Sequence, residues 1–312
     1  SGAVQDYNLD LSLNTSNTVF NYNEREIQLS NLSSTITKEN DNFIIENLSF
    51  EQQDLTFAAA GTYNLDSGFD LNYQLNNIEL QNYLGNYPQV AVKTSGTLNL
   101  EGQLQGQPDE LTLNFKLDAE DLSYDSIPLE IKENNFELEL GQQRLLVNNF
   151  AFSAGSGSYQ ISGEVLDLFT VPRSSLNLKL IEVPIEEYFQ KYLAFYPFAQ
   201  QMILKGETEL QTEGSDYTAA LNIDAYLAQK EQSSFSLNGE IGREVNLKFE
   251  ASELPLAFST EQYEINLRTE ADLSFSGNIA GTLLNPTLNL SHTLSSIEIN
   301  NTALETVDGD IL

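Results

Sequence analysis

Apolar and polar residues alternate along most of the chain. Between Gly96 and Leu117 the sequence reads GTLNLEGQLQGQPDELTLNFKL, in which leucines and a phenylalanine alternate with polar residues on both sides of a turn at 106–109. Successive side chains of a β-strand point to opposite faces, so this spacing places the apolar residues on one face and the polar residues on the other. The stretch is therefore predicted to be a β-hairpin that is apolar on one side.

The same patterns recur elsewhere in the chain. Ala271–Leu290 (ADLSFSGNIAGTLLNPTLNL) repeats the hairpin of 96–117, and FIIENLSF at 43–50 is echoed by LLVNNFAF at 145–152. Polar and glycine-rich turns separate the other alternating runs, which is typical of an all-β protein. Repeats of two-faced β units predict an extended sheet or solenoid rather than one compact catalytic domain.

Two longer segments interrupt the alternation. The stretch 78–93 loses its period of two, and Val183–Leu204 has apolar residues at helical spacing, with Pro184 suited to a first helical position. A weaker copy lies at Ala251–Phe258. We expect each interruption to return the chain to the same edge, so that every meander adds to one sheet. The predicted organisation is a β-meander over 1–77, a crossing segment over 78–93, a meander over 94–180, a crossing helix over 181–205, a meander over 206–250, and a crossing segment with a truncated β repeat over 251–312.

Charge and composition narrow the possible partners. The 312 residues include 46 acidic and 14 basic side chains, a formal charge of −32. This balance argues against nucleic acid and against electrostatic docking on anionic headgroups, both of which need clustered Lys and Arg. There is no cysteine, so disulfides and thiolate metal sites are excluded. No apolar run approaches the length of a membrane-spanning helix.

Residues that could carry catalysis do not form a recognisable site. His292 is the sole histidine, and we expect it on the surface of a polar strand. Ser156, between two glycines, lacks the strand-to-helix turn of a nucleophile elbow. Acidic pairs such as Glu137 and Glu139 alternate with apolar residues and should face solvent, and Asp308-Gly309-Asp310 lacks the further ligands of a calcium loop. The sequence predicts a protein that is not an enzyme, with no catalytic residue, metal or cofactor.

The predicted apolar face has two physical interpretations. In a sandwich or solenoid, two such faces pack about 10 Å apart and fill each other with side chains. A sheet whose apolar face is not covered instead exposes a long trough, and large exposed apolar surfaces normally mark a ligand or partner. Alternation alone leaves both interpretations open.

The order of the repeated motifs is similar to that of the TamB and AsmA-like proteins of diderm bacteria. Three segments carry the resemblance: the block at Gly96–Leu113, which reads G-x-L-x-L-x-G-x-L-x-G followed by Pro108, Leu111 and Leu113, the strand at Leu145–Phe152, and the Pro-helix-Gly segment at Val183–Gly206. The final block departs from the pattern with Ala271 in place of glycine, and the first unit lacks the Gly-x-Gly hairpin.

The resemblance implies a mainly antiparallel, elongated sheet curled like a taco around an apolar groove, with one or two short crossing helices. It implies a periplasmic fragment of a longer protein anchored in the inner membrane, which reaches an Omp85-type outer-membrane partner through the rest of the chain. Its implied function is to carry phospholipid acyl chains between the two membranes and so contribute to outer-membrane biogenesis. The expected groove-lining residues are Leu98, Leu100, Leu111, Leu113, Phe115, Leu117, Phe136, Leu138, Leu140, Leu178, Leu221, Ile223, Leu237, Leu247, Phe249, Leu273, Phe275, Leu288 and Leu290.

Other functions remain compatible with the pattern. Each expected groove residue could equally belong to a packed core, as in a structural scaffold or a secreted β-helical adhesin or autotransporter passenger. A membrane barrel would need lipid-facing strands with aromatic girdles, whereas Trp is absent and Tyr is scattered.

Overall fold

The computed structural model describes residues 9–22, 25–83, 94–185, 202–214, 216–227, 230–259, 268–299 and 302–311. Strand makes up 84% of the structure, and every strand pairing with a described register is antiparallel. The predictions of an all-β fold and of a mainly antiparallel meander are confirmed. Within the described residues, no helix is long and apolar enough to cross a membrane.

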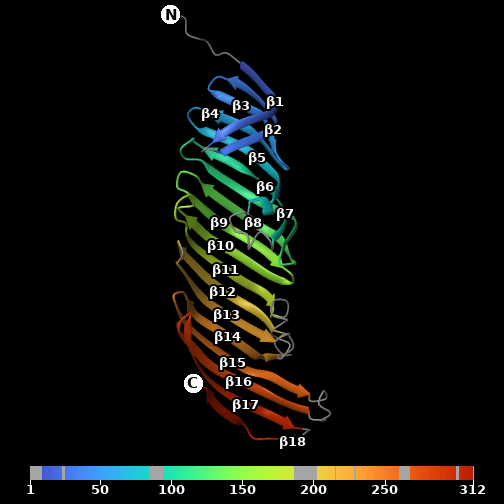
Figure 1. Cartoon of the computed structure of the whole chain (residues 1–312), viewed down its shortest axis with the longest axis vertical. Coiled ribbons are helices and arrows are strands. Elements are labelled where there is room, and N and C mark those ends of the chain that lie inside the picture. Colours follow the sequence, from blue (N-terminus) through green and yellow to red (C-terminus); the bar gives the residue numbers. More distant parts are fainter. Residues whose placement is uncertain are drawn as a thin grey trace, which may run out of the picture. The chain divides into compact units, whose positions relative to one another are not determined.

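The chain divides into two compact units, one formed by 1–152 with 164–170 and the other by 153–163 with 171–312. Unit 1 contains β1 (Leu9–Tyr22), β2 (Arg25–Glu39), β3 (Asn42–Gln52), β4 (Leu55–Asn64), β5 (Gly68–Glu79), α1 (Leu80–Tyr83), β6 (Thr94–Gly106), β7 (Thr112–Tyr124), β8 (Ile127–Glu139) and most of β9 (Arg144–Ala154). Unit 2 contains most of β10 (Gly157–Leu166), then β11 (Arg173–Pro184), β12 (Met202–Glu213), β13 (Asp216–Leu227), β14 (Lys230–Ile241), β15 (Glu244–Ser259), β16 (Arg268–Thr282), β17 (Asn285–Ile299), β18 (Thr302–Ala303) and β19 (Val307–Ile311). In each unit, strands that follow one another in the chain are neighbours in the sheet (Figure 1).

Short polar turns produce this meander. Between β4 and β5, the side-chain oxygen of Asn64 accepts hydrogen bonds from the backbone N–H groups of Asp66 and Ser67, at 2.8 and 3.1 Å. An Asn side chain that closes a turn in this way lets the chain reverse within a few residues. Consecutive strands therefore pair directly, and the alternation of each strand stays aligned with that of its neighbour.

Bulges explain where the alternation breaks. In β5, Asn76 and Asn77 together oppose the single residue Asn99, and the N–H of Asn77 donates to the Asn99 side chain at 3.0 Å. Leu75 and Ile78, on either side of this bulge, consequently stay on the same face. An extra residue in one strand shifts the side-chain period by one without ending the strand.

Unit 2 has a similar bulge in β15. Ser252 and Glu253 oppose Ser274, and the N–H of Glu253 donates to the Ser274 hydroxyl at 3.1 Å. Strand β15 therefore runs on to Ser259. The structure differs from the expectation of a crossing segment over 251–258. The strand continues through this stretch, and the bulge causes the loss of alternation.

The other expected crossing segments are described only in part. Residues 78–79 belong to β5 and the helical turn α1 follows, while 84–93 lie outside the described residues. Strand β11 extends to Pro184 and β12 begins at Met202. Most of the predicted helix, 186–201, lies outside the described residues.

Glycines permit close approach of neighbouring strands on the apolar face. Gly239 lies between Leu221 and Leu247 in the register and has a φ of 141°. A Cβ at this position would overlap the carbonyl oxygen of Asn246 and lie 2.9 Å from the Cα of Leu247. Only glycine fits both the backbone angle and the contact.

We predict that Gly239→Val lowers the free energy of unfolding by about 3 kcal/mol or more, since both the backbone angle and the packing must change. The matched control is Gly214→Asn. Gly214 has a φ of 59°, which Asn tolerates, and a Cβ there would meet only the Val171 side chain at 3.5 Å. Denaturant unfolding of both variants checks the prediction, and equal stabilities would contradict it.

Candidate functional site

Rows of apolar side chains cross the strands of unit 1. One row runs through Leu48, Ala59, Tyr73, Gly102, Phe115 and Phe136, each paired with the next across β3 to β8. A parallel row pairs Phe50 with Phe57, Leu75, Leu100 and Leu117. Ring contacts reinforce the first row, since the Phe115 and Phe136 centroids are 5.1 Å apart and those of Phe136 and Phe150 are 5.6 Å apart. We call this surface the apolar face of unit 1.

All nine residues that the sequence predicted to line a groove in this part of the chain lie on that face. Leu98 and Leu100 are on β6, Leu113, Phe115 and Leu117 on β7, and Phe136 and Leu138 on β8. Leu111 and Leu140 flank these strands and are joined by a backbone hydrogen bond of 2.9 Å. Phe136 is buried, and the other eight are partly exposed.

Unit 2 has an equivalent apolar face. One row pairs Leu180 with Gly206, Ile223, Leu237, Phe249, Gly277 and Leu290 in succession. The next row pairs Leu178 with Thr208, Leu221, Gly239, Leu247, Ile279 and Leu288. Phe275 pairs with Ala251, and Leu273 with Leu254, on the same side. The ten groove residues predicted in this part of the chain therefore share one face.

These faces are only partly covered. Eight of the ten predicted residues of unit 2 are partly exposed, whereas Leu247 is buried at 7% and Leu288 is exposed at 44%. In the described part of each unit, extensive backbone contacts join strands that are neighbours in the sheet.

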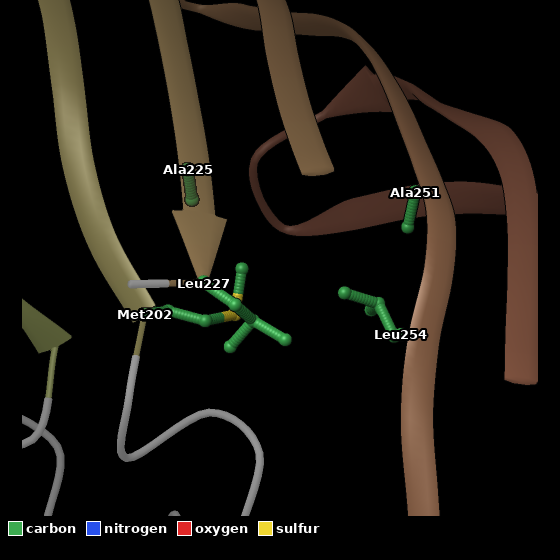
Figure 2. Close-up of a cluster of buried hydrophobic side chains, with 5 residues drawn as sticks. All are labelled: Met202, Ala225, Leu227, Ala251 and Leu254. Atoms are coloured by element: carbon green, nitrogen blue, oxygen red, sulfur yellow. The ribbon is translucent and has the colours of Figure 1, made fainter. Parts of the chain in front are cut away.

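One end of the unit 2 face is filled by its own side chains. Met202, Ala225, Leu227, Ala251 and Leu254 form a buried cluster, in which Met202, Leu227 and Leu254 point toward one another (Figure 2). Ser233 is fully buried beside this end, and its hydroxyl donates to the carbonyl of Glu253 in the β15 bulge at 2.6 Å. Packing against the cluster extends to Leu273 and Phe275, which therefore contribute to a core as well as to the face.

The structure adds residues to the face that sequence reasoning left out. Phe57, Leu71, Tyr73 and Leu75 continue the unit 1 rows, and their alternation along the chain was the available signal. His292 also lies on an apolar face and is partly buried, so it keeps part of the expected surface exposure but lies on the apolar side of its strand. It follows Leu288 and Leu290 at intervals of two, which places it on their side of the strand.

Tyr73 carries a polar atom without a partner. Its side chain is 9% exposed, and its hydroxyl has no hydrogen-bond partner among the described residues. Burial raises the pKa of Tyr73 to about 12, because the phenolate would lose its hydration. The neighbours on either side, Ala59 and Gly102, are too small to offer an acceptor from a side chain.

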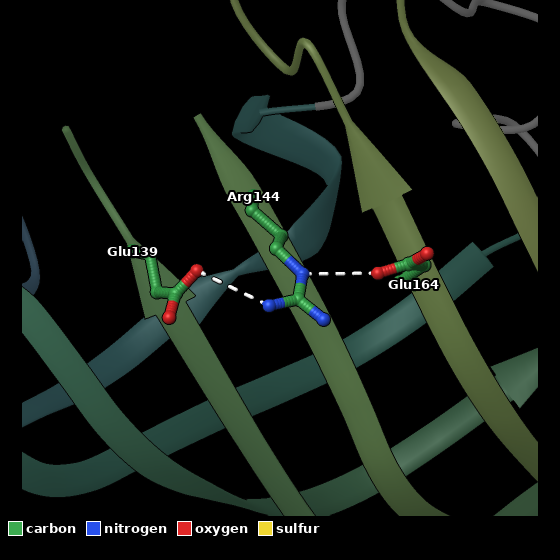
Figure 3. Close-up of polar contacts among 3 residues, drawn as sticks. All are labelled: Glu139, Arg144 and Glu164. Atoms are coloured by element: carbon green, nitrogen blue, oxygen red, sulfur yellow. Dashed lines mark hydrogen bonds and ion pairs between the residues drawn. The ribbon is translucent and has the colours of Figure 1, made fainter. Parts of the chain in front are cut away.

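The opposite face of each unit is polar. In unit 1, the Nε of Arg144 lies 2.9 Å from Glu164 and its Nη1 lies 3.5 Å from Glu139 (Figure 3). A hollow of about 560 Å³ also opens on this side, lined mainly by Ala, Asn, Gln and Glu side chains and by Lys116. In the described ranges, no cluster of three or more His, Asp or Glu side chains could hold a metal ion.

The arrangement is suited to binding apolar chains. Half-exposed Leu, Ile and Phe side chains gain free energy when a hydrocarbon displaces the water over them, at about 0.8 kcal/mol for each CH₂ that is buried. A contact of this kind has no preferred position along the row, so a chain bound there could move without breaking specific interactions.

Comparisons with protein-family models, curated proteins and solved structures found no match to the chain.

We predict that Tyr73→Phe raises stability slightly or leaves it unchanged at pH 7, because it removes an unpaired buried hydroxyl. In the wild type, the unfolded phenol ionises near pH 10 and the folded one near pH 12. The unfolded state therefore releases its proton first, and the free energy of unfolding falls as the pH rises through this window, by up to about 2 kcal/mol.

Denaturant unfolding at pH 7, 10 and 11.5 measures the free energy of unfolding of the wild type and of Tyr73→Phe. The other tyrosines contribute equally to both proteins, so the difference between the two reports on Tyr73. A smaller alkaline loss in Tyr73→Phe is expected. Equal losses in the two proteins would show that the Tyr73 hydroxyl is solvated.

Proposed function

We propose that the chain is a periplasmic lipid-transfer module of the TamB and AsmA-like kind, in which phospholipid acyl chains lie on the apolar faces. The observation that carries the proposal is the alignment of partly exposed Leu, Ile and Phe residues into rows on one side of each unit. A soluble protein rarely keeps an apolar surface of this extent without a ligand or partner.

The size of the faces supports hydrocarbon as the ligand. The unit 1 row from Leu48 to Phe136 crosses six strands, and strands lie about 4.8 Å apart, so the row spans roughly 24 Å. Each methylene held there contributes at most about 0.8 kcal/mol. Many weak and equivalent contacts of this kind favour retention of an acyl chain without fixing its position.

The charge distribution supports the same function. Polar side chains occupy the opposite face, and the chain has a formal charge of −32. The protein should consequently be repelled by anionic membrane surfaces, which favours transfer along the sheet over adsorption to either membrane. In the proposed full-length protein, an inner-membrane anchor and an Omp85-type partner supply the contacts with the membranes.

The proposed function requires a curled sheet with short crossing helices. A sheet curled like a taco would shield the apolar faces from bulk water while leaving one side open for headgroups. One or two short crossing helices, which return the chain to the same edge of the sheet, complete the proposed fold. The β5 and β15 bulges support curvature, since an extra residue bends its strand and increases the local twist.

The buried cluster at Met202 favours one alternative, a structural scaffold or adhesin whose apolar side chains fill their own core. In a filled core, a charge anywhere on the face would unfold the protein. On an open face, a charge would remove ligand binding while the sheet stays intact. Substitution on the face therefore separates the two functions.

We predict that Phe275→Arg lowers the transfer of a fluorescent phospholipid between vesicles by about tenfold or more, because a guanidinium group among acyl methylenes carries a large desolvation cost. Leu113→Asp is the equivalent change in unit 1. The matched control is Ser276→Arg, which adds the same charge to the adjacent, exposed position on the opposite face. Its transfer rate should stay within about twofold of the wild type.

Circular dichroism and thermal unfolding establish whether each variant is folded. Folded variants with lost transfer support the proposal. Unfolding of both Phe275→Arg and Leu113→Asp, with Ser276→Arg intact, would indicate a packed core. Folded face variants that transfer lipid at the wild-type rate would contradict acyl-chain binding on these faces.

A further inference from the structure

The single histidine of the chain lies within the apolar face of unit 2. His292 on β17 pairs with Phe275 on β16, which in turn pairs with Ala251 on β15. On its other side, His292 pairs with Gly309 on β19. The imidazole lies against the Gly309 backbone, since a Cβ built there would come within 2.9 Å of Nε2. Glycine on the neighbouring strand thus leaves room for the ring.

No other charged group shares this face at the positions whose side chains the structure describes. The rows of β11 to β17 carry aliphatic, aromatic, glycine and threonine residues on this side. The described positions that flank His292 on the adjacent strands are Leu273, Phe275, Gly277, Val307 and Gly309. None of them titrates.

Asp308, which precedes Gly309 on β19, belongs to the opposite face. Asp308 pairs in register with Thr293, and its carboxylate accepts a hydrogen bond from the Thr293 hydroxyl at 2.7 Å. Both residues alternate with His292 and Gly309, so they point away from the imidazole. A protonated imidazole therefore has no carboxylate partner on its own side among the described side chains.

We propose that His292 is the anion contact of the unit 2 face, where the protonated imidazole pairs with the phosphate or carboxylate of an amphiphile. The apolar part of the ligand lies along Phe275 and Leu290. This inference rests on the proposed function, because it names the headgroup chemistry of the same surface.

The remaining surface of the protein disfavours an anionic headgroup. A protein with a formal charge of −32 repels an anionic headgroup over most of its surface. Imidazole is the side chain that titrates between pH 5 and 8, and a charge-assisted hydrogen bond to an anion is stronger than a neutral one. His292 is partly exposed, and Leu288 and Val307 nearby are 44% and 51% exposed, so an amphiphile can approach.

Two dyes with one ring system test the assignment. 1-Anilinonaphthalene-8-sulfonate carries a sulfonate that stays ionised at every pH used, and N-phenyl-1-naphthylamine is its uncharged analogue. Fluorescence titration of the whole chain at pH 5.5 and 8.0 should show sulfonate binding about three- to tenfold tighter at pH 5.5. The uncharged dye should bind equally at both values.

Variants separate the effect of the His292 imidazole on dye binding from the effect of the negative charge that the whole protein loses at low pH. His292→Gln should abolish most of the pH dependence for the sulfonate and leave the uncharged dye unaffected. His292→Lys should keep tight sulfonate binding at both pH values. Circular dichroism of each variant verifies folding. If sulfonate binding to His292→Gln depends on pH as strongly as binding to the wild type, the assignment is overturned.

The outcomes also separate this inference from the proposed function. Binding of the uncharged dye, without any effect of His292 on the sulfonate, would overturn the anion contact and leave the apolar face as a binding surface. Failure of both dyes to bind would contradict the proposed function itself. At pH 5.5, stronger competition by lysophosphatidic acid or by palmitate in the wild type than in His292→Gln identifies phosphate or carboxylate as the partner, and equal competition in the two proteins would overturn the assignment.

Discussion

The register between neighbouring strands decides whether an apolar face forms at all. Each strand alternates apolar and polar side chains, but a continuous apolar face forms only if neighbouring strands align their apolar positions. Antiparallel pairing through short turns provides that alignment, as in the pairs Leu100–Leu117 and Leu237–Phe249. Where a strand gains a residue, at Asn77 or Glu253, a bulge absorbs it and returns the next apolar side chain to the same face. A slip of one residue would place every leucine in water.

The incomplete covering of these faces connects the fold to the proposed function. A protein that folds around a closed core gains most of its stability from side chains that water does not reach. Here only local regions reach that state, such as the Met202 cluster and Phe136, while most face residues stay partly exposed. The backbone ladder holds the sheet together, and the remaining apolar surface is available to a hydrocarbon ligand. Among the described residues of the unit 2 face, His292 is the proposed partner for the charge of a headgroup.

Much of this arrangement could be predicted from period-two spacing, which depends only on strand geometry. The predicted groove residues from Leu98 to Leu140 share one face for that reason, and the same rule, applied to Leu288, Leu290 and His292, also places the histidine there. The bulge at 252–253 could not be predicted, because the loss of alternation in the sequence is equally typical of a segment that leaves the sheet. The unpaired hydroxyl of Tyr73 depends on small residues at Ala59 and Gly102, which are distant in sequence and become neighbours only through the register.

The proposed function requires that the apolar faces hold acyl chains. Native mass spectrometry of the protein, expressed in bacteria and purified without detergent, tests this requirement, with organic extraction to identify what is bound. We expect adducts with the masses of phospholipids, which disappear on extraction and return when phospholipid is added. A bare polypeptide mass that takes up no added phospholipid would contradict acyl-chain binding and show that the faces are closed by the protein itself.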